Sequence, residues 1–209
     1  MIRRLLFHWC NSQRPCRDEA IRQKRMLRFR RSALGRVLEF DHEIRKNHRI
    51  DKNMPDLLVN LLKLPPLEPL VLEADATGVL IRRAQPFEIT PVRSFVEKEF
   101  SLAWADEISV GFTNKPVSIY IAVVEREIVG FAAYECTRRG FFGPTGVIEN
   151  MQGRGVGKAL LLACLWGLRG MGYVYGIIGG AGPVEFYEKA VGAIVIPDSD
   201  PGIYTNLLR

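Results

Sequence analysis

Hydrophobic and polar positions follow two alternating spacings from residue 54 onward. Short apolar runs bounded by glycine, proline or charged residues predict β-strands, and longer runs with helical spacing predict helices. Strands are expected at residues 79–83, 118–125, 127–136, 140–148, 173–179, 193–197 and 203–208. Helices are expected at residues 90–111, where an interruption of the helix stays open, and at residues 155–170 and 183–192. This alternation predicts an α/β protein with a mixed, mostly antiparallel sheet and helices on both of its faces.

Local signals refine some of these elements. Thr90 followed by Pro91 predicts a helix start, with a hydroxyl at the N-cap and a proline at the first helical position. The polar turn at residues 125–127 predicts a hairpin between the two strands that flank it. Residues 54–70 form an apolar lead-in interrupted by prolines, and we assign no strand or helix to it.

The expected strand 140–148 contains an element that a central strand does not tolerate. Its sequence includes Gly143-Pro144-Thr145-Gly146, and a proline has no N–H group to donate to a sheet ladder. A bulge would resolve this conflict by bending the strand away from its neighbour. We therefore expect a splayed central strand with a gap beside it.

The positive charge of the chain is confined to its first quarter. The net charge is +6 overall, but residues 1–53 hold 15 Lys or Arg against 6 Asp or Glu, whereas residues 54–209 hold 14 against 17. We therefore divide the chain into a basic N-terminal extension, residues 1–53, and a globular domain, residues 54–209. Arginine-rich runs such as residues 22–31 place charge on every face of a helix, which predicts a disordered or weakly helical extension.

Three interpretations of residues 1–53 stay open. The segment could be a basic arm that contacts nucleic acid or an anionic surface, in which case nucleic acid would be a partner only through this arm. It could be an organelle-targeting segment, because it is arginine-rich and has no acidic residue before Asp18. It could also lie outside the functional protein, with Met54 as the initiator.

Composition excludes several kinds of chemistry. All three histidines precede Met54, so residues 54–209 have no imidazole for a Ser-His-Asp or Cys-His nucleophile, and no metal is expected there. The four cysteines form no CxxC pair, and Cys164 is expected to be a buried small hydrophobe. The longest apolar stretch, residues 159–168, is too short to cross a membrane, and no secretory signal is visible. We expect a cytoplasmic protein without membrane partners.

Residues 152–158 have the features of a phosphate-binding loop. Three glycines spaced by two lie between a strand and an apolar helix, where free N–H groups and the helix dipole favour an anion, and two cations stand beside them. A Walker A loop is disfavoured because Gln152 replaces its first glycine and Ala159 its hydroxyl residue. The dinucleotide pattern G-x-G-x-x-G also fails. The intact pattern is Q-x-x-G-x-G.

With this loop, the sequence resembles the GNAT superfamily of acyl-CoA-dependent N-acyltransferases. Three segments resemble the family in order and spacing: the hairpin VVEREIVGFAAYE (123–135), the loop segment VIENMQGRGVGKALL (147–161) and EFYEKAVGA (185–193), which is similar to its FYEKxGF signature. Together they cover most of residues 79–209. The resemblance implies a GNAT-like fold and acetyl-CoA as cosubstrate. It implies that the cofactor is held by Val147, Gln152, Gly153, Arg154, Gly155, Val156, Gly157 and Lys158.

The resemblance also implies the reaction. Tyr187 matches the position where many family members have a tyrosine as general acid, with core packing as its alternative role. The acceptor implied is the amine of a small molecule or metabolite, and the alternatives are a protein lysine or N-terminus, or a non-catalytic acyl-CoA-binding regulatory module. A homodimer stays open, and so does the acceptor's identity. Trp104 and Glu107 are candidates for the acceptor pocket.

The sequence departs from the family's pattern at two positions and leaves one role unassigned. The family's asparagine upstream of the tyrosine falls near Gly180, and its phenylalanine after the glycine is Ala193. The general base is not identified, and Glu107, Glu135 and Glu149 are its candidates.

Overall fold

A seven-stranded mixed sheet forms the centre of the domain. The computed structural model describes residues 54–205, so our expectations for residues 1–53 and 206–209 lie outside the described residues. The strands are arranged in the order β2-β3-β4-β5-β6-β1-β7, and all neighbours are antiparallel except β5 and β6. Their bounds are β1 Leu57–Asn60, β2 Leu80–Arg83, β3 Ile119–Val124, β4 Glu127–Tyr134, β5 Phe141–Val147, β6 Tyr175–Ile178 and β7 Ile194–Val195.

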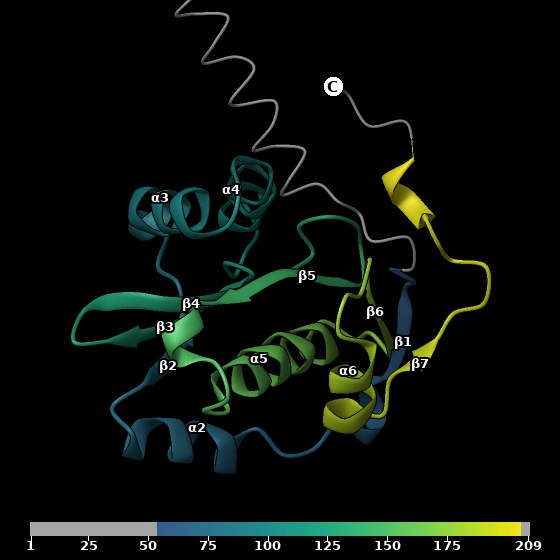
Figure 1. Cartoon of the computed structure of the whole chain (residues 1–209), viewed down its shortest axis with the longest axis horizontal. Coiled ribbons are helices and arrows are strands. Elements are labelled where there is room, and N and C mark those ends of the chain that lie inside the picture. Colours follow the sequence, from purple (N-terminus) through teal and green to yellow (C-terminus); the bar gives the residue numbers. More distant parts are fainter. Residues whose placement is uncertain (1–53, 206–209) are drawn as a thin grey trace, which may run out of the picture. The chain divides into compact units, whose positions relative to one another are not determined.

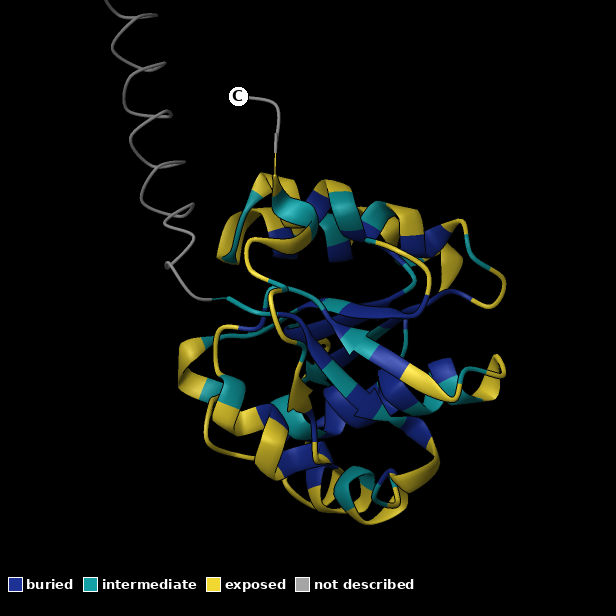
Figure 2. Ribbon diagram, turned by 90° about the vertical axis from the view of Figure 1, so that its right-hand side faces the viewer, coloured by how far each residue is buried: buried dark blue, intermediate teal, exposed yellow. Residues whose placement is uncertain are grey.

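Helices cover both faces of the sheet (Figure 1). One face carries α3 (Ile89–Glu99) and α4 (Leu102–Ser109), and the other carries α2 (Glu68–Ala76), α5 (Val156–Gly170) and α6 (Val184–Val191). Each face has its own apolar cluster, and Figure 2 shows the buried residues concentrated in the sheet and on the helix sides that face it. This arrangement confirms the expected fold class.

Helix α5 is the most buried helix because its apolar residues are not confined to one stripe. Nine of its 15 residues are buried, since the helix packs against β3, β4 and β5 and is covered by α2 on its outer side. Cys164 is fully buried within it, as expected, and burial raises the pKa of its thiol well above the usual range.

The predicted hairpin between β3 and β4 is confirmed. Its turn residues Glu125 and Arg126 have φ angles of 49° and 73°, which match the positive values that a two-residue hairpin turn requires. The strands pair from Ile119 with Ala133 to Val124 with Glu127. The hairpin places β4 beside β5 and so sets the position of the functional site.

Two elements, β1 and α2, were not predicted from the sequence. Residues 57–60 form β1, an inner strand between β6 and β7, and its Leu57 and Val59 are fully buried. Helix α2 follows the prolines, with Pro69 in its first turn. A four-residue apolar run has too few positions to reveal its periodicity, and its strand state depends on pairing with residues more than 110 positions away.

The expected helix 90–111 is corrected at its start, and the break that its pattern left open is present. Helix α3 begins at Ile89 with Glu88 at the N-cap position, so Thr90 is not the cap, although Pro91 still lies in the first turn. The helix ends at Glu99, and Ser101 starts α4 by accepting a hydrogen bond from the N–H of Trp104 at 3.2 Å.

The expected strand 203–208 is wrong where the structure describes it. Residues Gly202–Tyr204 form a 3-10 turn, and residues 206–208 lie outside the described residues. The aromatic ring of Tyr204 packs against glycines rather than against a strand partner. The pattern Ile-Tyr-Thr has β propensity, but that propensity is context-dependent, and tertiary contacts override it here.

Candidate functional site

Strands β5 and β6 diverge after two residue pairs. They pair in parallel only at Phe141 with Ile177 and Phe142 with Ile178. Strand β5 then continues beside β4 to Val147, while β6 ends at Ile178. At the point of parting, Gly143 and Pro144 stand opposite a single residue of β4, which is the bulge expected from the proline. The split between the strands is therefore confirmed.

The backbone of β5 presents polar groups to this split. The N–H of Ile148 donates to the carbonyl of Val129 at 3.0 Å, so Ile148 belongs to a hydrogen-bonded pair of the β4–β5 ladder. Pairs alternate in an antiparallel ladder, and Val147 and Thr145 therefore direct their N–H and C=O groups away from β4 and toward the split. The side-chain amide of Gln152 donates to the Val147 carbonyl at 3.0 Å.

The loop after β5 leads into α5 through two left-handed glycines. Gly153 and Gly155 have φ angles of 74° and 80°, and Gly155 is the N-cap residue of α5 without a side-chain cap. A Cβ atom at either glycine would meet nothing within 4 Å, so the structure requires glycine here for its backbone conformation. Without a cap, the first N–H groups of α5 are left for another acceptor.

Two cationic side chains stand at this helix start. Arg154 is exposed and Lys158 is half-buried, and neither forms an ion pair within residues 54–205. Val156 buries its side chain, so only its backbone is available to a ligand. Gly157 lies beside the end of β5, because a Cβ added to it would stand 3.8 Å from the side chain of Val147. The structure thus brings the loop residues predicted from the sequence together with Val147.

Tyr187 lies at the closed end of the split. Its ring packs edge-to-face on Phe142, the last residue of β5 that pairs with β6, at 6.3 Å between ring centroids. Tyr187 is 6% exposed, and burial raises the pKa of its hydroxyl to about 12. The residue therefore packs α6 against the sheet, and its hydroxyl keeps its proton at neutral pH.

Comparison with solved structures relates this geometry to known proteins. No protein-family model matches the sequence, and no curated protein matches it. A GCN5-related glucosamine N-acetyltransferase region in a fungal multi-domain GH3 β-N-acetylglucosaminidase aligns with 70% of this chain at a TM-score of 0.57 and 14% identity. A GCN5-related N-acetyltransferase from Sphaerobacter thermophilus aligns with 68% at a TM-score of 0.51 and 20% identity.

This chain has the GNAT fold. The identities are low, so the likeness concerns the fold, and it confirms the resemblance of the sequence at that level. The aligned part corresponds to 20% of the fungal chain and 48% of the Sphaerobacter chain, so this chain spans less than half the length of either protein.

Gly180, the departure from the GNAT pattern, has a structural explanation. Its φ angle is 52°, and a Cβ atom there would stand 2.9 Å from the ring of Tyr204. Its N–H donates to the carboxylate of Asp56 at 2.8 Å. Asp56 and Tyr204 therefore occupy this side of the split, and neither was among the predicted site residues. No signal in the sequence links Asp56 to Gly180, from which it is separated by 124 positions.

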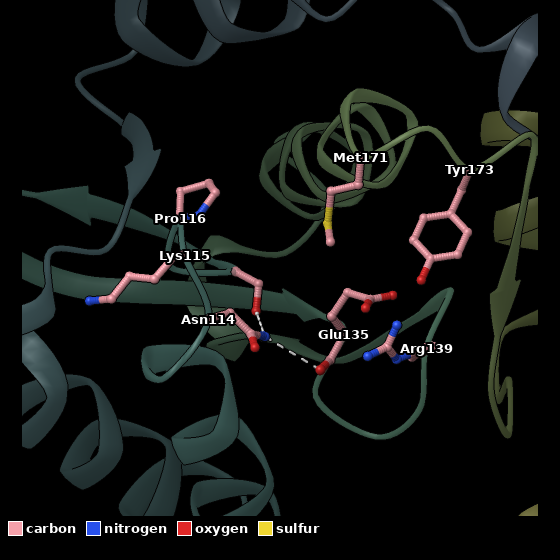
Figure 3. A pocket seen from close by; sticks show the side chains of 8 residues that line it. Asn114, Lys115, Pro116, Glu135, Arg139, Met171 and Tyr173 are labelled. Atoms are coloured by element: carbon pink, nitrogen blue, oxygen red, sulfur yellow. Dashed lines mark hydrogen bonds between the residues drawn. The ribbon is translucent and has the colours of Figure 1, made fainter.

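The three candidate bases lie in different environments. Glu149 is exposed at the start of the loop after β5. Glu135 lines a polar cavity of about 430 Å³ (Figure 3). Met171 and Tyr173, which follow the carboxyl end of α5, line the same cavity. The Glu135 carboxylate accepts a hydrogen bond from the N–H of Gly140, and the hydroxyl of Tyr173 points toward it. Since α5 is about 22 Å long at 1.5 Å per residue, Glu135 lies far from the glycine loop.

Glu107 differs from the other two because it is largely buried. Its carboxylate accepts a hydrogen bond from the hydroxyl of Thr137, in the loop between β4 and β5. Burial raises its pKa, although the Thr137 hydroxyl and the charge of Arg138 oppose the shift. Glu107 is the candidate that combines burial, a raised pKa and a position on the α4 side of the split.

Aromatic side chains complete the α4 side. Phe100 and Trp104 stack with centroids 5.8 Å apart, and both contact Phe131 of β4 edge-to-face. The Phe100 ring lies directly over Gly146 of β5, where a Cβ atom would collide with it. Trp104 is 37% exposed, so it is neither a pure core residue nor a solvated one. Trp104 and Glu107 are three residues apart on α4, which is the spacing of neighbours on one side of a helix.

Within residues 54–205, no group of three or more His, Cys, Asp or Glu side chains is placed to hold a metal ion. None of the helices in this part of the chain has the length and apolar character needed to cross a bilayer.

Proposed function

We propose that this chain is an N-acetyltransferase that moves the acetyl group of acetyl-CoA to the primary amine of a small molecule. The observation that carries the proposal is the uncapped start of α5, preceded by left-handed glycines and placed beside the split between β5 and β6. A helix start binds a pyrophosphate, and a split strand pair offers room and hydrogen bonds to an extended amide chain.

Each predicted cofactor residue has a role in this proposal. The N–H groups of residues 152–158 would hold the pyrophosphate of acetyl-CoA, and the side chains of Arg154 and Lys158 would add positive charge. The backbone of Val147 would pair with the pantetheine arm, because it points into the split. The pantetheine would then run from the loop toward the bulge at Pro144, where the acyl group would lie.

Tyr187 would assist the departure of the CoA sulphur. A phenol whose pKa is raised to about 12 does not readily pass its proton to a thiolate, because a free thiol has a pKa of about 8.5. The hydroxyl can nevertheless donate a hydrogen bond to the developing negative charge, and such bonds are worth about 1.5–3 kcal/mol. We therefore assign Tyr187 as the hydrogen-bond donor to the leaving group.

Two alternatives share the same cofactor site. The acceptor could be a protein lysine or N-terminus, or the domain could bind acyl-CoA without catalysis as a regulatory module. The largely buried Glu107 on α4 favours catalysis, because a carboxylate with a raised pKa is suited to proton transfer. An alkyl ammonium has a pKa of about 10.4, so any amine acceptor must lose a proton before it attacks.

The test is a calorimetric titration of the full-length chain with acetyl-CoA and with S-acetylpantetheine, which lacks the pyrophosphate. We expect acetyl-CoA to bind at least tenfold more tightly, a difference of about 1.4 kcal/mol, because the loop contacts only the longer ligand. Release of free CoA thiol is then measured with phenethylamine, spermidine and a lysine-containing peptide. Equal affinity for both donors would contradict the loop assignment, and thiol release with the peptide alone would favour the protein acceptor.

A further inference from the structure

The closed end of the split, where β5 and β6 still pair, is built differently on its two faces. On the face covered by α5 and α6, Phe142, Ile178 and Tyr187 are all buried and belong to one apolar cluster. This α5 face therefore has no room for a further group. Phe141 points to the opposite face, the α4 face, because neighbouring side chains alternate along a strand. A Cβ atom on Gly179, the first residue after β6, would stand 3.0 Å from the Phe141 ring.

Tyr204 covers the β6 side of this closed end. Its hydroxyl would stand 3.3 Å from a Cβ atom on Gly179, and its ring would stand 2.9 Å from a Cβ atom on Gly180. The absence of side chains at both glycines lets the half-buried ring lie against the backbone that follows β6. On the β5 side, by contrast, a Cβ atom on Gly143 would meet nothing within 4 Å. The closed end is thus walled by an aromatic ring beside β6 and bordered by open space beside β5.

Asp56 fixes the segment that carries this ring. The N–H of Asp56 donates to the hydroxyl of Ser199 at 2.9 Å, and its carbonyl accepts from the N–H of Ile196 at 2.9 Å. Its carboxylate accepts from the N–H of Gly180 at 2.8 Å. Asp56 is buried, so water competes little for these bonds. The C-terminal segment is therefore tied to the end of β6, and the Tyr204 ring keeps a defined position.

We propose that the ring of Tyr204 limits the acyl group of the donor to a short chain, an inference that rests on the proposed acetyltransferase function. With the pantetheine arm running from the glycine loop to the bulge at Pro144, the thioester lies where the two strands diverge. The acyl chain would extend from there into the open space beside Gly143. Since neighbouring strands lie about 4.8 Å apart, the ring over Gly179 is only about one strand spacing away.

This spacing indicates which donors fit. The methyl group of an acetyl thioester occupies the open space without reaching the ring, whereas each further methylene must displace a ring that the Asp56 hydrogen bonds hold in place. A fixed apolar wall discriminates by about tenfold or more for each methylene. We therefore expect the donor to be acetyl-CoA and not a medium-chain acyl-CoA.

The experiment measures donor selectivity in the full-length chain. Thiol release from acetyl-, butyryl- and hexanoyl-CoA is followed with the amine that supports the fastest release from acetyl-CoA, and kcat/KM is compared between donors. We expect wild type to prefer acetyl-CoA over hexanoyl-CoA by about 100-fold or more. Tyr204→Ala removes the wall and should reduce this preference to less than about tenfold, by raising kcat/KM for hexanoyl-CoA. Tyr204→Phe keeps the ring and should keep the preference.

Tyr175→Ala is the matched control. Tyr175 begins β6, pairs with Asn60 and is 55% exposed, so its variant loses the same ring from the same strand away from the split. We expect unchanged selectivity in this variant. If Tyr204→Ala does not fold, Tyr204→Leu replaces it, and the smaller side chain should admit butyryl-CoA before hexanoyl-CoA.

The outcomes separate the inference from the function on which it rests. A wild-type chain that binds no acetyl-CoA overturns both. Binding without thiol release overturns catalysis, and calorimetric affinities for the three donors then test the ring in place of kcat/KM. Equal use of acetyl- and hexanoyl-CoA by wild type overturns the inference alone, and so does a folded Tyr204→Ala or Tyr204→Leu variant with the wild-type preference. A preference lost equally in Tyr204→Phe would assign the effect to the hydroxyl and overturn the role of the ring.

Discussion

The two faces of the split are built from different parts of the chain. On the α5 face, the groups that would meet the cofactor come mostly from one continuous segment, residues 147–158, and most of them are backbone N–H and C=O groups. On the α4 face, the groups are side chains: Glu107 of α4 accepts a hydrogen bond from Thr137 in the β4–β5 loop, and the stacked Phe100 and Trp104 lie beside Gly146 of β5. A backbone site suits a ligand that every member of a fold class shares, whereas a side-chain site can change with the substrate.

The largest expected effect comes from a substitution that changes the backbone of the α5 face. Gly155→Val places a β-branched residue at a φ angle of 80°, a conformation that such residues rarely adopt. The loop must then rearrange, and the loss of one or two charge-assisted hydrogen bonds to the pyrophosphate should weaken acetyl-CoA binding about 100-fold. Calorimetry of the folded variant measures this.

Gly170→Ala is the matched control for that prediction. Gly170 also has open space around its Cβ position, but it lies at the end of α5 with an ordinary φ angle. We expect unchanged cofactor affinity in this variant. Unchanged affinity in a folded Gly155→Val protein would mean that the cofactor does not contact this loop.

The second-largest effect is expected from a substitution that disturbs the α4 face and leaves the α5 face intact. Gly146→Ala forces the Phe100 ring away from β5 and, through stacking, displaces Trp104. Overpacking of this kind costs about 1–3 kcal/mol of stability, and the KM for the amine should rise while acetyl-CoA affinity changes little. Thermal unfolding and steady-state kinetics measure these effects.

A second substitution tests whether the cause is the collision. Phe100→Leu in the Gly146→Ala background removes the ring that the new methyl group meets, so it should restore part of the lost stability. A double variant that is less stable than the sum of the two single changes would contradict the proposed contact.

The difference between the faces also explains what could be predicted from the sequence. The glycine loop was predictable because the conformation of Gly153 and Gly155 is a local requirement, and the bulge was predictable because Pro144 lacks an N–H group. Strand β1 and the position of Asp56 were not predictable, since each depends on pairing or packing with residues more than 110 positions away. Glu107 was one of three equal candidates until its burial distinguished it.

A third effect, smaller than the first two, concerns the hydroxyl that the α5 face contributes. Tyr187→Phe keeps the ring contacts with Phe142 and Phe186 and removes only the hydrogen-bond donor. We expect kcat to fall about tenfold, at the lower end of the value of a hydrogen bond to a charged group, with unchanged acetyl-CoA affinity and unchanged stability. An unchanged kcat would leave Tyr187 with a packing role alone.

The smallest expected effect concerns stability on the α4 face and distinguishes a functional carboxylate from a structural one. Burial raises the pKa of Glu107 in the folded state, so the folded protein binds its proton more tightly than the unfolded chain does. Stability from this group is complete below the ordinary carboxyl pKa, and it is lost as the pH rises through the raised pKa of the folded state. At neutral pH the ionised Glu107 therefore weakens the fold.

Glu107→Gln removes this penalty, because glutamine does not titrate. Thermal unfolding should give a slightly higher Tm for the variant than for wild type at neutral pH, and the difference should disappear at acidic pH, where Glu107 is protonated. Asp106→Asn should show no such pattern, because its side chain is mostly exposed. A residue retained only for stability would give the opposite sign, so a lower Tm in Glu107→Gln at neutral pH would assign the carboxylate to the fold instead of to the reaction.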